Sequence, residues 1–313
     1  MFQFNFNVNS EAETDPQTLG GEHGETVQVW LPAQKHEITH SHLLDPSDVI
    51  AEITLCKTKM KYLTMSSALK KLQEKETACN LSTVLDKHSD LVPAVYEGGL
   101  TIWECTWDLL NHLADMDIIF KNKRVLEIGC GAALPAIFCA LHGAHITLQD
   151  YNEEVVNFVT IPNVALNLYN KTSRNASAKD EHLTESLSSK ATFYSGDWAA
   201  VNQLLSSQCE YENEQTENIR KDADGEERKF DLILTSETIY NPSCHKKLLD
   251  LMTAHLKHDG LILLAAKTHY FGVGGGTQQF ADLVKTQGQL DVHFITSNNS
   301  GVKREIIQMK FKN

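Results

Sequence analysis

The feature that most constrains the fold is a regular alternation of short apolar runs with helical segments, which begins near Lys123. Several of these runs are followed by a segment with helical periodicity or with residues that start and stop helices, as over 133–142 and 243–257. Such alternation is typical of a parallel sheet that helices cover on both faces. The runs of strand length span 125–128, 146–149, 192–195, 231–236 and 261–266.

The pattern changes at the end of the sequence. Two further runs, 290–296 and 305–312, are separated only by 297–301, which is too short for a crossover helix. They must pair antiparallel, so the sequence predicts seven strands, mostly parallel, with one reversed strand from this hairpin. A sheet of this type binds ligands at the carboxyl ends of its strands, beside the first strand of the series.

The rest of the chain differs in composition from this core. Its 313 residues leave room for one large α/β domain, which we expect over 49–313 with its core from about 95. Within 1–8, phenylalanines alternate with polar residues, which predicts a short half-buried strand. Residues 9–48 are acidic and short of large aliphatic residues, so we expect a disordered linker there.

Three other stretches have a clear local pattern. Apolar residues recur at helical spacing over 102–114, which indicates an amphipathic helix. Residues 53–63 suggest an extended stretch. The polar segments 170–190 and 207–229 are expected to be surface insertions between core elements.

The charge, the hydropathy and the cysteine and histidine patterns limit the possible partners and the cellular compartment. The net charge of −13 argues against direct binding of nucleic acid and is compatible with a basic protein partner. No apolar run approaches the length that spans a bilayer, so no membrane association is expected. The seven cysteines form no C-x-x-C pair, which favours a reducing compartment. Histidines in 9–48 are irregularly spaced, so we expect no metal site.

A glycine loop follows the first strand of the series. Glu127, Gly129 and Gly131 stand at its carboxyl end, and Asp150 ends the next strand, where a carboxylate can accept hydrogen bonds from ribose hydroxyls. This pattern also occurs in NAD sites. Two features favour S-adenosylmethionine (SAM): Leu134 replaces the third glycine of the NAD motif, and the terminal hairpin is unlike the second half of a dinucleotide fold.

A second loop follows the third strand and reads Gly196-Asp197-Trp198. In this fold that position faces an adenine ring. Asp197 can accept a hydrogen bond from the exocyclic amine, and Trp198 offers a flat face for stacking. The alternative for Trp198 is an ordinary core position.

Four segments and the opening Phe-x-Phe-x-Phe alternation resemble the eukaryotic histidine protein methyltransferases, which are class I SAM-dependent enzymes. The resemblance covers about 90–313 well and the first 90 residues thinly. One departure is that Ala132 and Ala133 follow Gly131 where this family has Ser-Gly, which removes a hydroxyl near the methionine moiety. The four segments are 95–106, 149–151, 234–242 and 267–276.

The resemblance implies a Rossmann-like class I methyltransferase sheet and an enzyme of cytoplasm and nucleus. Its reaction would transfer a methyl group to the tele nitrogen of a histidine in a large-subunit ribosomal protein. The cofactor contacts that it implies are Ile102, Trp103, Glu104, Cys105, Thr106, Gly129, Gln149, Asp150, Tyr151, Gly196, Asp197, Trp198 and Ser236.

Polar residues just past the fourth strand are candidates for orienting the acceptor. Glu237, Tyr240 and Asn241 lie beside the position where the methyl group should emerge. A neutral imidazole needs no strong base, only an oxygen that holds its Nδ1 hydrogen and leaves the lone pair on Nε2. Asn241, Glu237 or a backbone carbonyl can supply that oxygen, and Glu237 can also stabilise the imidazolium. The alternative for Tyr240 and Asn241 is a plain loop that ends at Pro242.

Three other functions remain open. Glu237-Thr-Ile-Tyr240 resembles the D-x-x-Y motif of protein-lysine methyltransferases with the acid changed. A small-molecule methyltransferase is the second alternative. The third is a non-catalytic SAM-binding ribosome-assembly factor.

Overall fold

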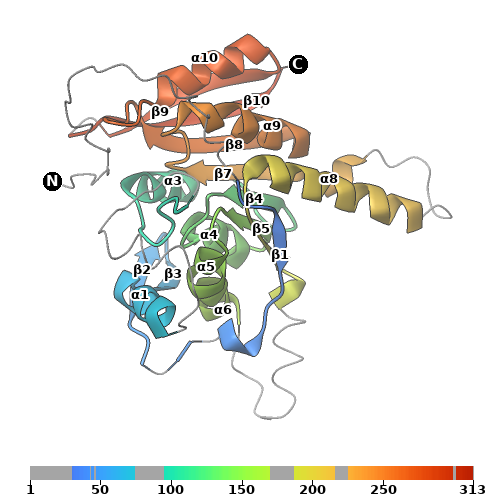
Figure 1. The fold of residues 1–313 in the computed structure, drawn as a ribbon. Helices are drawn as coiled ribbons and strands as arrows, with labels where there is room; N and C mark the ends of the chain where they lie inside the picture. Colours follow the sequence, from blue (N-terminus) through green and yellow to red (C-terminus); the bar gives the residue numbers. More distant parts are fainter. Residues whose placement is uncertain are drawn as a thin grey trace, which may run out of the picture.

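The computed structural model describes residues 30–42, 44–45, 47–74, 95–169, 187–215, 225–298 and 301–312 (Figure 1). The strand expected over 1–8 and most of the insertion expected over 170–190 lie outside the described residues.

An eight-stranded sheet forms the centre of the fold, with the order β1-β6-β5-β4-β7-β8-β10-β9. The strands β4 to β8 pair parallel, and β10 is antiparallel to both β8 and β9. This arrangement confirms the mostly parallel sheet and the reversed strand from the terminal hairpin. The bounds are β4 Arg124–Ile128, β5 His145–Asp150, β6 Ala191–Ser195, β7 Phe230–Ser236, β8 Leu256–Lys267, β9 Leu290–Asn298 and β10 Arg304–Phe311.

The strand count differs from the expected seven because β1, Gln34–His36, adds an antiparallel strand beside β6. This strand lies inside the segment 9–48, for which a disordered linker was expected. His36 makes a 2.7 Å hydrogen bond with the Ser195 hydroxyl, and β1 covers the outer edge of β6. Three residues are too few for a periodic pattern, so the sequence carries no strand signal here.

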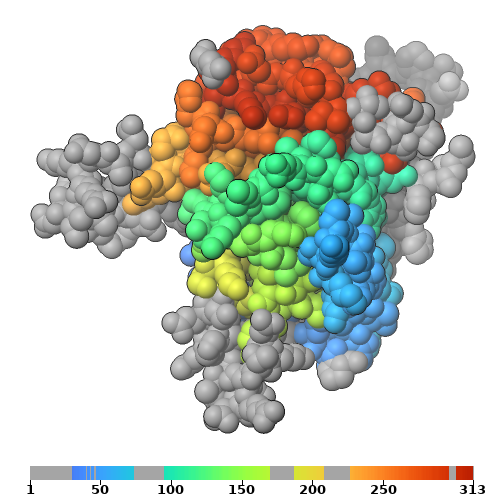
Figure 2. All heavy atoms as spheres, turned by 180° about the vertical axis from the view of Figure 1, so that it is seen from behind, coloured from blue at the N-terminus to red at the C-terminus, as the bar shows by residue number. Residues whose placement is uncertain are grey.

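Helices cover both faces of the sheet. Figure 1 shows α8 and α9 in front of it, and Figure 2 shows the opposite face, which carries α3 in teal and α4 to α6 in green. The helix α5 continues through a π-helical segment into α6. The bounds are α3 Glu104–Asp115, α4 Leu134–Leu141, α5 Glu153–Val155, η2 Val156–Thr160, α6 Ile161–Leu168, α8 Trp198–Gln215, α9 His245–His255 and α10 Thr277–Gln287.

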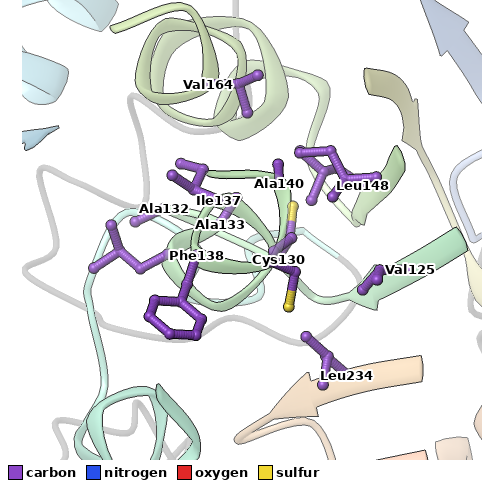
Figure 3. Close-up of a cluster of buried hydrophobic side chains, with 14 of the residues drawn as sticks. Val125, Cys130, Ala132, Ala133, Ile137, Phe138, Ala140, Leu148, Val164 and Leu234 are labelled. Atoms are coloured by element: carbon purple, nitrogen blue, oxygen red, sulfur yellow. The ribbon is translucent and has the colours of Figure 1, made fainter. Parts of the chain in front are cut away.

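Alternate residues of each central strand enter two separate hydrophobic cores. In β7, Leu232 and Leu234 pack toward α3, α4 and α6, whereas Ile233 packs toward α8, α9 and α10. Figure 3 shows Ile137 of α4 on the side of Val164 in α6, with Phe138 on the opposite side of the helix. Burial on both faces explains why these strands read as continuous apolar runs.

Smaller elements complete the fold. The extended stretch expected over 53–63 is a hairpin of β2 Ile50–Leu55 and β3 Thr58–Leu63, followed by α1 Met65–Glu74. This unit packs beside α4 and α6, as Figure 2 shows in blue. The insertion expected over 207–229 begins inside α8 and ends in η3 Gly225–Arg228, and the remaining short helices are η1 His40–His42 and η4 Pro242–Cys244. No helix among the described residues is long and apolar enough to cross a membrane.

Candidate functional site

A pocket of about 830 Å³, part of it open to solvent, lies at the carboxyl ends of β4, β5, β6 and β7. The pocket is lined by Trp30, Glu97, Gly98, Gly99, Thr101, Ile102, Trp103, Thr106, Gly129, Cys130, Gly131, Ala132, Asp150, Tyr151, Asp197, Trp198, Ser236, Glu237, Thr238, Tyr240, Asn241, Cys244 and Lys247.

The glycine loop after β4 forms part of the pocket wall. Gly129 and Gly131 have φ values of +61° and +47°, which favour glycine. A Cβ at Gly129 would stand 2.6 Å from Thr238, and one at Gly131 would stand 2.9 Å from the Gly99 carbonyl oxygen. Ala133 adopts φ +57° at the position where the resembling family has glycine. Ala133 therefore holds a left-handed backbone conformation, which ordinarily favours glycine, with a side chain in place.

Two buried carboxylates below this loop accept backbone hydrogen bonds. Asp150 accepts from the N–H groups of Gly131 and Tyr151, both at 2.8 Å. Glu127 accepts from the N–H of Ala136 at 2.8 Å and so satisfies the first turn of α4. Burial raises the pKa of Asp150 to about 6 and that of Glu127 to about 8.

Gln149 connects the loops around the pocket and lies behind its wall. Its Nε2 donates to the Gly196 carbonyl, and its Oε1 accepts from the N–H of Gly129 and from Nε1 of Trp198. Gly196 has φ +114°, and a Cβ there would stand 2.3 Å from the Pro32 carbonyl oxygen. Gly196 therefore makes room for the N-terminal segment.

The end of the pocket near β6 is aromatic and charge-compensated. Asp197 caps α8 through the N–H of Ala199 and forms an ion pair with Lys247. The Lys247 ammonium stands 3.2 Å from the ring centre of Trp30, which meets Tyr151 edge-on. The segment that carries Trp30 is fixed by hydrogen bonds between Leu31 and both Asp197 and Tyr151.

The end near β7 and β8 contains a buried ion pair. The Tyr270 hydroxyl donates to Oε2 of Glu237 at 2.5 Å, and Nζ of Lys267 stands 3.5 Å from Oε1 of the same carboxylate. Burial raises the pKa of Tyr270, and the negative charge of Glu237 raises it further. Glu237 has φ +58°, and strained backbone of this kind clusters at functional sites.

A second tyrosine and a second glutamate meet nearby. The Tyr240 hydroxyl donates to Oε2 of Glu97, and the rings of Tyr240 and Tyr270 meet edge-on at 6.3 Å. Oδ1 of Asn241 accepts from the backbone N–H and the hydroxyl of Ser243, so this amide caps η4.

The structure brings together thirteen of the eighteen residues named from the sequence, and it places the other five outside the pocket lining. Glu127, Gln149 and Gly196 have the structural contacts described above. Cys105 is buried beneath the lining, and Glu104 forms an ion pair with Arg304. The thirteen are Ile102, Trp103, Thr106, Gly129, Gly131, Asp150, Tyr151, Asp197, Trp198, Ser236, Glu237, Tyr240 and Asn241.

Sequence reasoning missed Trp30, Glu97, Cys244 and Lys247, which also line the pocket. Glu97 lies in a segment that carries the family resemblance, so its position offered a signal. Trp30 is an isolated aromatic residue in an acidic stretch, and Lys247 is one of two adjacent lysines in a helix. Neither pattern indicates a pocket.

Comparison with known proteins agrees with this geometry. Residues 105–288 match the family model described as a methyltransferase domain. The chain is 34% identical over 296 residues to a histidine protein methyltransferase 1 homolog of Mus musculus, covering 90% of this chain and 75% of that protein. The corresponding protein of Saccharomyces cerevisiae is 32% identical over 261 residues, covering 71% of this chain and 67% of that protein.

The homolog of Dictyostelium discoideum is 39% identical over 231 residues, which cover 73% of this chain. The chain spans 62% of the length of that relative and 64% of the length of the Rattus norvegicus relative. With a methyltransferase domain over most of its sheet, this chain belongs to the histidine protein methyltransferase family.

Proposed function

We propose that the chain transfers the methyl group of SAM to the tele nitrogen of a histidine in a large-subunit ribosomal protein. The observation that carries the proposal is a single pocket whose two ends differ in chemistry. One end has a glycine loop beside Asp150, and the other end has tyrosines beside the carboxylates of Glu97 and Glu237. The names of the relatives support histidine as the acceptor.

The residues present fit SAM. Gly129 and Gly131 line the pocket with backbone that carries no side chain, so a ligand can approach it closely, and Asp150 offers carboxylate oxygens for ribose hydroxyls. Tyr151 and Trp198 add aromatic surface for the adenine ring. When bound, SAM supplies an electrophilic methyl group on a sulfonium.

The contribution of this chain is to position and desolvate the acceptor. A neutral imidazole attacks through a lone pair, so the site needs an oxygen that holds the other ring hydrogen rather than a strong base. Glu237, Tyr240 and Asn241 are our candidates at this end of the pocket. Glu237 is compensated by Lys267, and Asn241 caps η4, so their contacts favour supporting roles.

The test is incubation with labelled SAM and extracted large-subunit ribosomal proteins, followed by mass spectrometry and chromatography of the hydrolysed product. We expect tele-methylhistidine in one ribosomal protein. The pros isomer would contradict the proposed regiochemistry, and methyl-lysine would favour the lysine alternative that the Glu237–Tyr240 motif resembles. Absence of transfer to any protein would favour a non-catalytic SAM-binding factor. Location in the cytoplasm and nucleus stays a prediction that the family resemblance implies.

A further inference from the structure

The glycine loop has a backbone conformation that needs support from its surroundings. Within 129–133, three residues have φ in the left-handed region, namely Gly129, Gly131 and Ala133. At Ala133 this conformation carries a cost, because its Cβ crowds the backbone. Strained backbone of this kind persists only where neighbouring contacts fix it. The contacts that hold the loop therefore help to form the pocket wall.

One of these contacts comes from the π-helical segment η2. The hydroxyl of Thr160, the last residue of this segment, donates to the Gly131 carbonyl at 2.7 Å. Thr160 is fully buried, so solvent does not replace this hydrogen bond. A π-helical turn adds one residue to a helix, and such turns are frequent at functional sites. Here the turn ends at the residue that contacts the glycine loop.

A second contact comes from the start of α6. Nδ2 of Asn163, which is also fully buried, donates to the Ala132 carbonyl at 3.1 Å. Ala132 lines the pocket. Thr160 and Asn163 therefore hold two successive carbonyls, which belong to the two peptide groups that join Gly131 to Ala133. These are the peptide groups between two of the left-handed residues.

Asn163 also holds the hairpin of β2 and β3. Its Oδ1 accepts from the N–H of Leu63 at 2.8 Å. One turn later in α6, Asn167 accepts from the N–H of Lys61 at 2.8 Å and donates to the Lys61 carbonyl at 2.7 Å. The two amides thus pair with the outer edge of β3. The amide of Asn163 contacts both the hairpin and the Ala132 carbonyl, so it links the hairpin with the glycine loop.

We propose that Thr160 and Asn163 are positioning residues that keep the glycine loop in the conformation that binds SAM, and that Asn163 links the hairpin of β2 and β3 to cofactor binding. This proposal rests on the cofactor part of the proposed function and is independent of the acceptor. Both residues lie outside the pocket lining, so they act through the loop. If one hydrogen bond is lost, a fraction of the molecules leaves the binding conformation, and the apparent Kd rises in inverse proportion to the fraction that remains.

The first test is Thr160→Val in the full chain, which keeps the shape of the side chain and removes the hydroxyl. By calorimetry we expect the SAM Kd to rise about three- to tenfold, the range for one hydrogen bond. Thr160→Ser keeps the hydroxyl and should stay within about twofold of the wild-type Kd. Turnover of Thr160→Val at saturating SAM should also stay within about twofold, because the cofactor restores the loop conformation when it binds.

A buried threonine in the sheet is the matched control. Oγ1 of Thr147 forms a 2.9 Å hydrogen bond with Oγ1 of Thr192, and Thr147 is buried and outside the pocket lining. Thr147→Val should therefore lower stability in denaturant unfolding, as Thr160→Val does, but leave the SAM Kd unchanged. This pair of variants separates support of the loop from support of the fold.

The second test compares the two asparagines of α6. Asn163→Ala should raise the SAM Kd about three- to tenfold, for the same reason as Thr160→Val. Asn167→Ala loosens the hairpin but leaves the contact with Ala132 intact, so its Kd should stay within about twofold of the wild-type value. Because coupling between two sites is reciprocal, SAM should slow hydrogen exchange of the Leu63 amide in the wild-type chain by a larger factor than that of the Lys61 amide.

Several outcomes would overturn the proposal. An unchanged Kd in Thr160→Val, or an equal rise in Thr147→Val, would reject the positioning of the loop by Thr160. Full affinity in Asn163→Ala, or equal slowing of the Leu63 and Lys61 amides, would reject the link through Asn163. If Asn163→Ala does not fold, the exchange rates of the wild-type chain decide that link. Absence of SAM binding by the wild-type chain would reject the cofactor assignment itself, which is a separate result.

Discussion

The two ends of the pocket differ in the groups that donate hydrogen bonds to their carboxylates. At the end with the glycine loop, which we assign to the cofactor and call the cofactor end, Asp150 accepts hydrogen bonds from backbone N–H groups, and so does Glu127 behind the lining. At the acceptor end, Glu97 and Glu237 accept from the hydroxyls of Tyr240 and Tyr270. Backbone donors come from elements adjacent in the sequence, whereas the tyrosines come from elsewhere in the chain.

The two kinds of hydrogen-bond donor differ in how freely they can move. Backbone N–H groups are fixed by the path of the strand, loop and helix, so the cofactor end is preformed. A tyrosine hydroxyl can rotate and exchange partners, so the acceptor end can adjust when a side chain enters. Substitutions at the cofactor end should therefore change cofactor affinity, and substitutions at the acceptor end should change turnover or stability.

The largest expected effect is on stability, at the ion pair of Glu237 and Lys267. Both side chains are nearly inaccessible, at 6% and 5% exposure. Lys267→Met leaves the carboxylate of Glu237 buried without its cation, which should lower the free energy of unfolding by about 3–5 kcal/mol. Denaturant unfolding of the full chain measures this change.

A neighbouring ion pair provides the control. Lys303 pairs with Glu305 at 2.9 Å, but its side chain is 53% exposed. Lys303→Met should change the free energy of unfolding by less than about 1 kcal/mol. Equal effects of the two lysine variants would mean that the ion pair at the acceptor end contributes no more than a surface pair.

The next effect concerns cofactor affinity. Asp150→Ala removes the carboxylate at the end of β5 and should weaken SAM binding by about 1–3 kcal/mol, the range for a hydrogen bond to a charged group. Calorimetry measures the Kd. Asp282→Ala, an exposed aspartate of α10, should leave the Kd unchanged. An unchanged Kd in Asp150→Ala would remove this carboxylate from the cofactor site.

The pH dependence of binding tests the same residue through its ionisation. Burial raises the pKa of Asp150 to about 6. The ionised form accepts hydroxyl hydrogens, so SAM affinity should be constant above about pH 7 and fall below pH 6, at most about tenfold per pH unit. Asp150→Asn should flatten this profile. A decline that persists in Asp150→Asn would assign the titration to another group.

The pocket lining near β4 and β5 was largely predictable because its signals are local. Gly129, Gly131 and Asp150 end consecutive strands, and parallel strands bring such positions to one edge. The same locality misled us for Glu127 and Gln149, which lie in or beside the same loops but face away from the pocket. Side chains alternate across a strand, and a strand buried on both faces gives no polarity pattern that tells the two sides apart.

The pocket lining near β7 was predictable only in part. Glu237 and Tyr240 follow a recognisable strand, but their partners do not. Glu97 and Tyr240 are 143 residues apart, and Tyr270 is 33 residues beyond Glu237. Such contacts depend on the packing of complete elements. The eighth strand β1 was missed for a similar reason, since it depends on the edge of β6 rather than on its own pattern.

The smallest expected effect concerns Trp30, which is an exception to the difference between the two ends of the pocket. Trp30 lies at the cofactor end, yet it comes from a distant segment that β1 holds against β6. If its ring forms part of the adenine wall, Trp30→Ala should weaken SAM binding by about 0.5–1.5 kcal/mol, the range for one aromatic contact. Trp30→Phe keeps an aromatic face and should retain most of the affinity. A Kd that is unchanged in Trp30→Ala would mean that the cofactor end depends on the glycine loop and its neighbours alone. Equal losses in both variants would instead point to the contact between the Trp30 ring and Lys247, because indole binds an ammonium group more strongly than phenyl does.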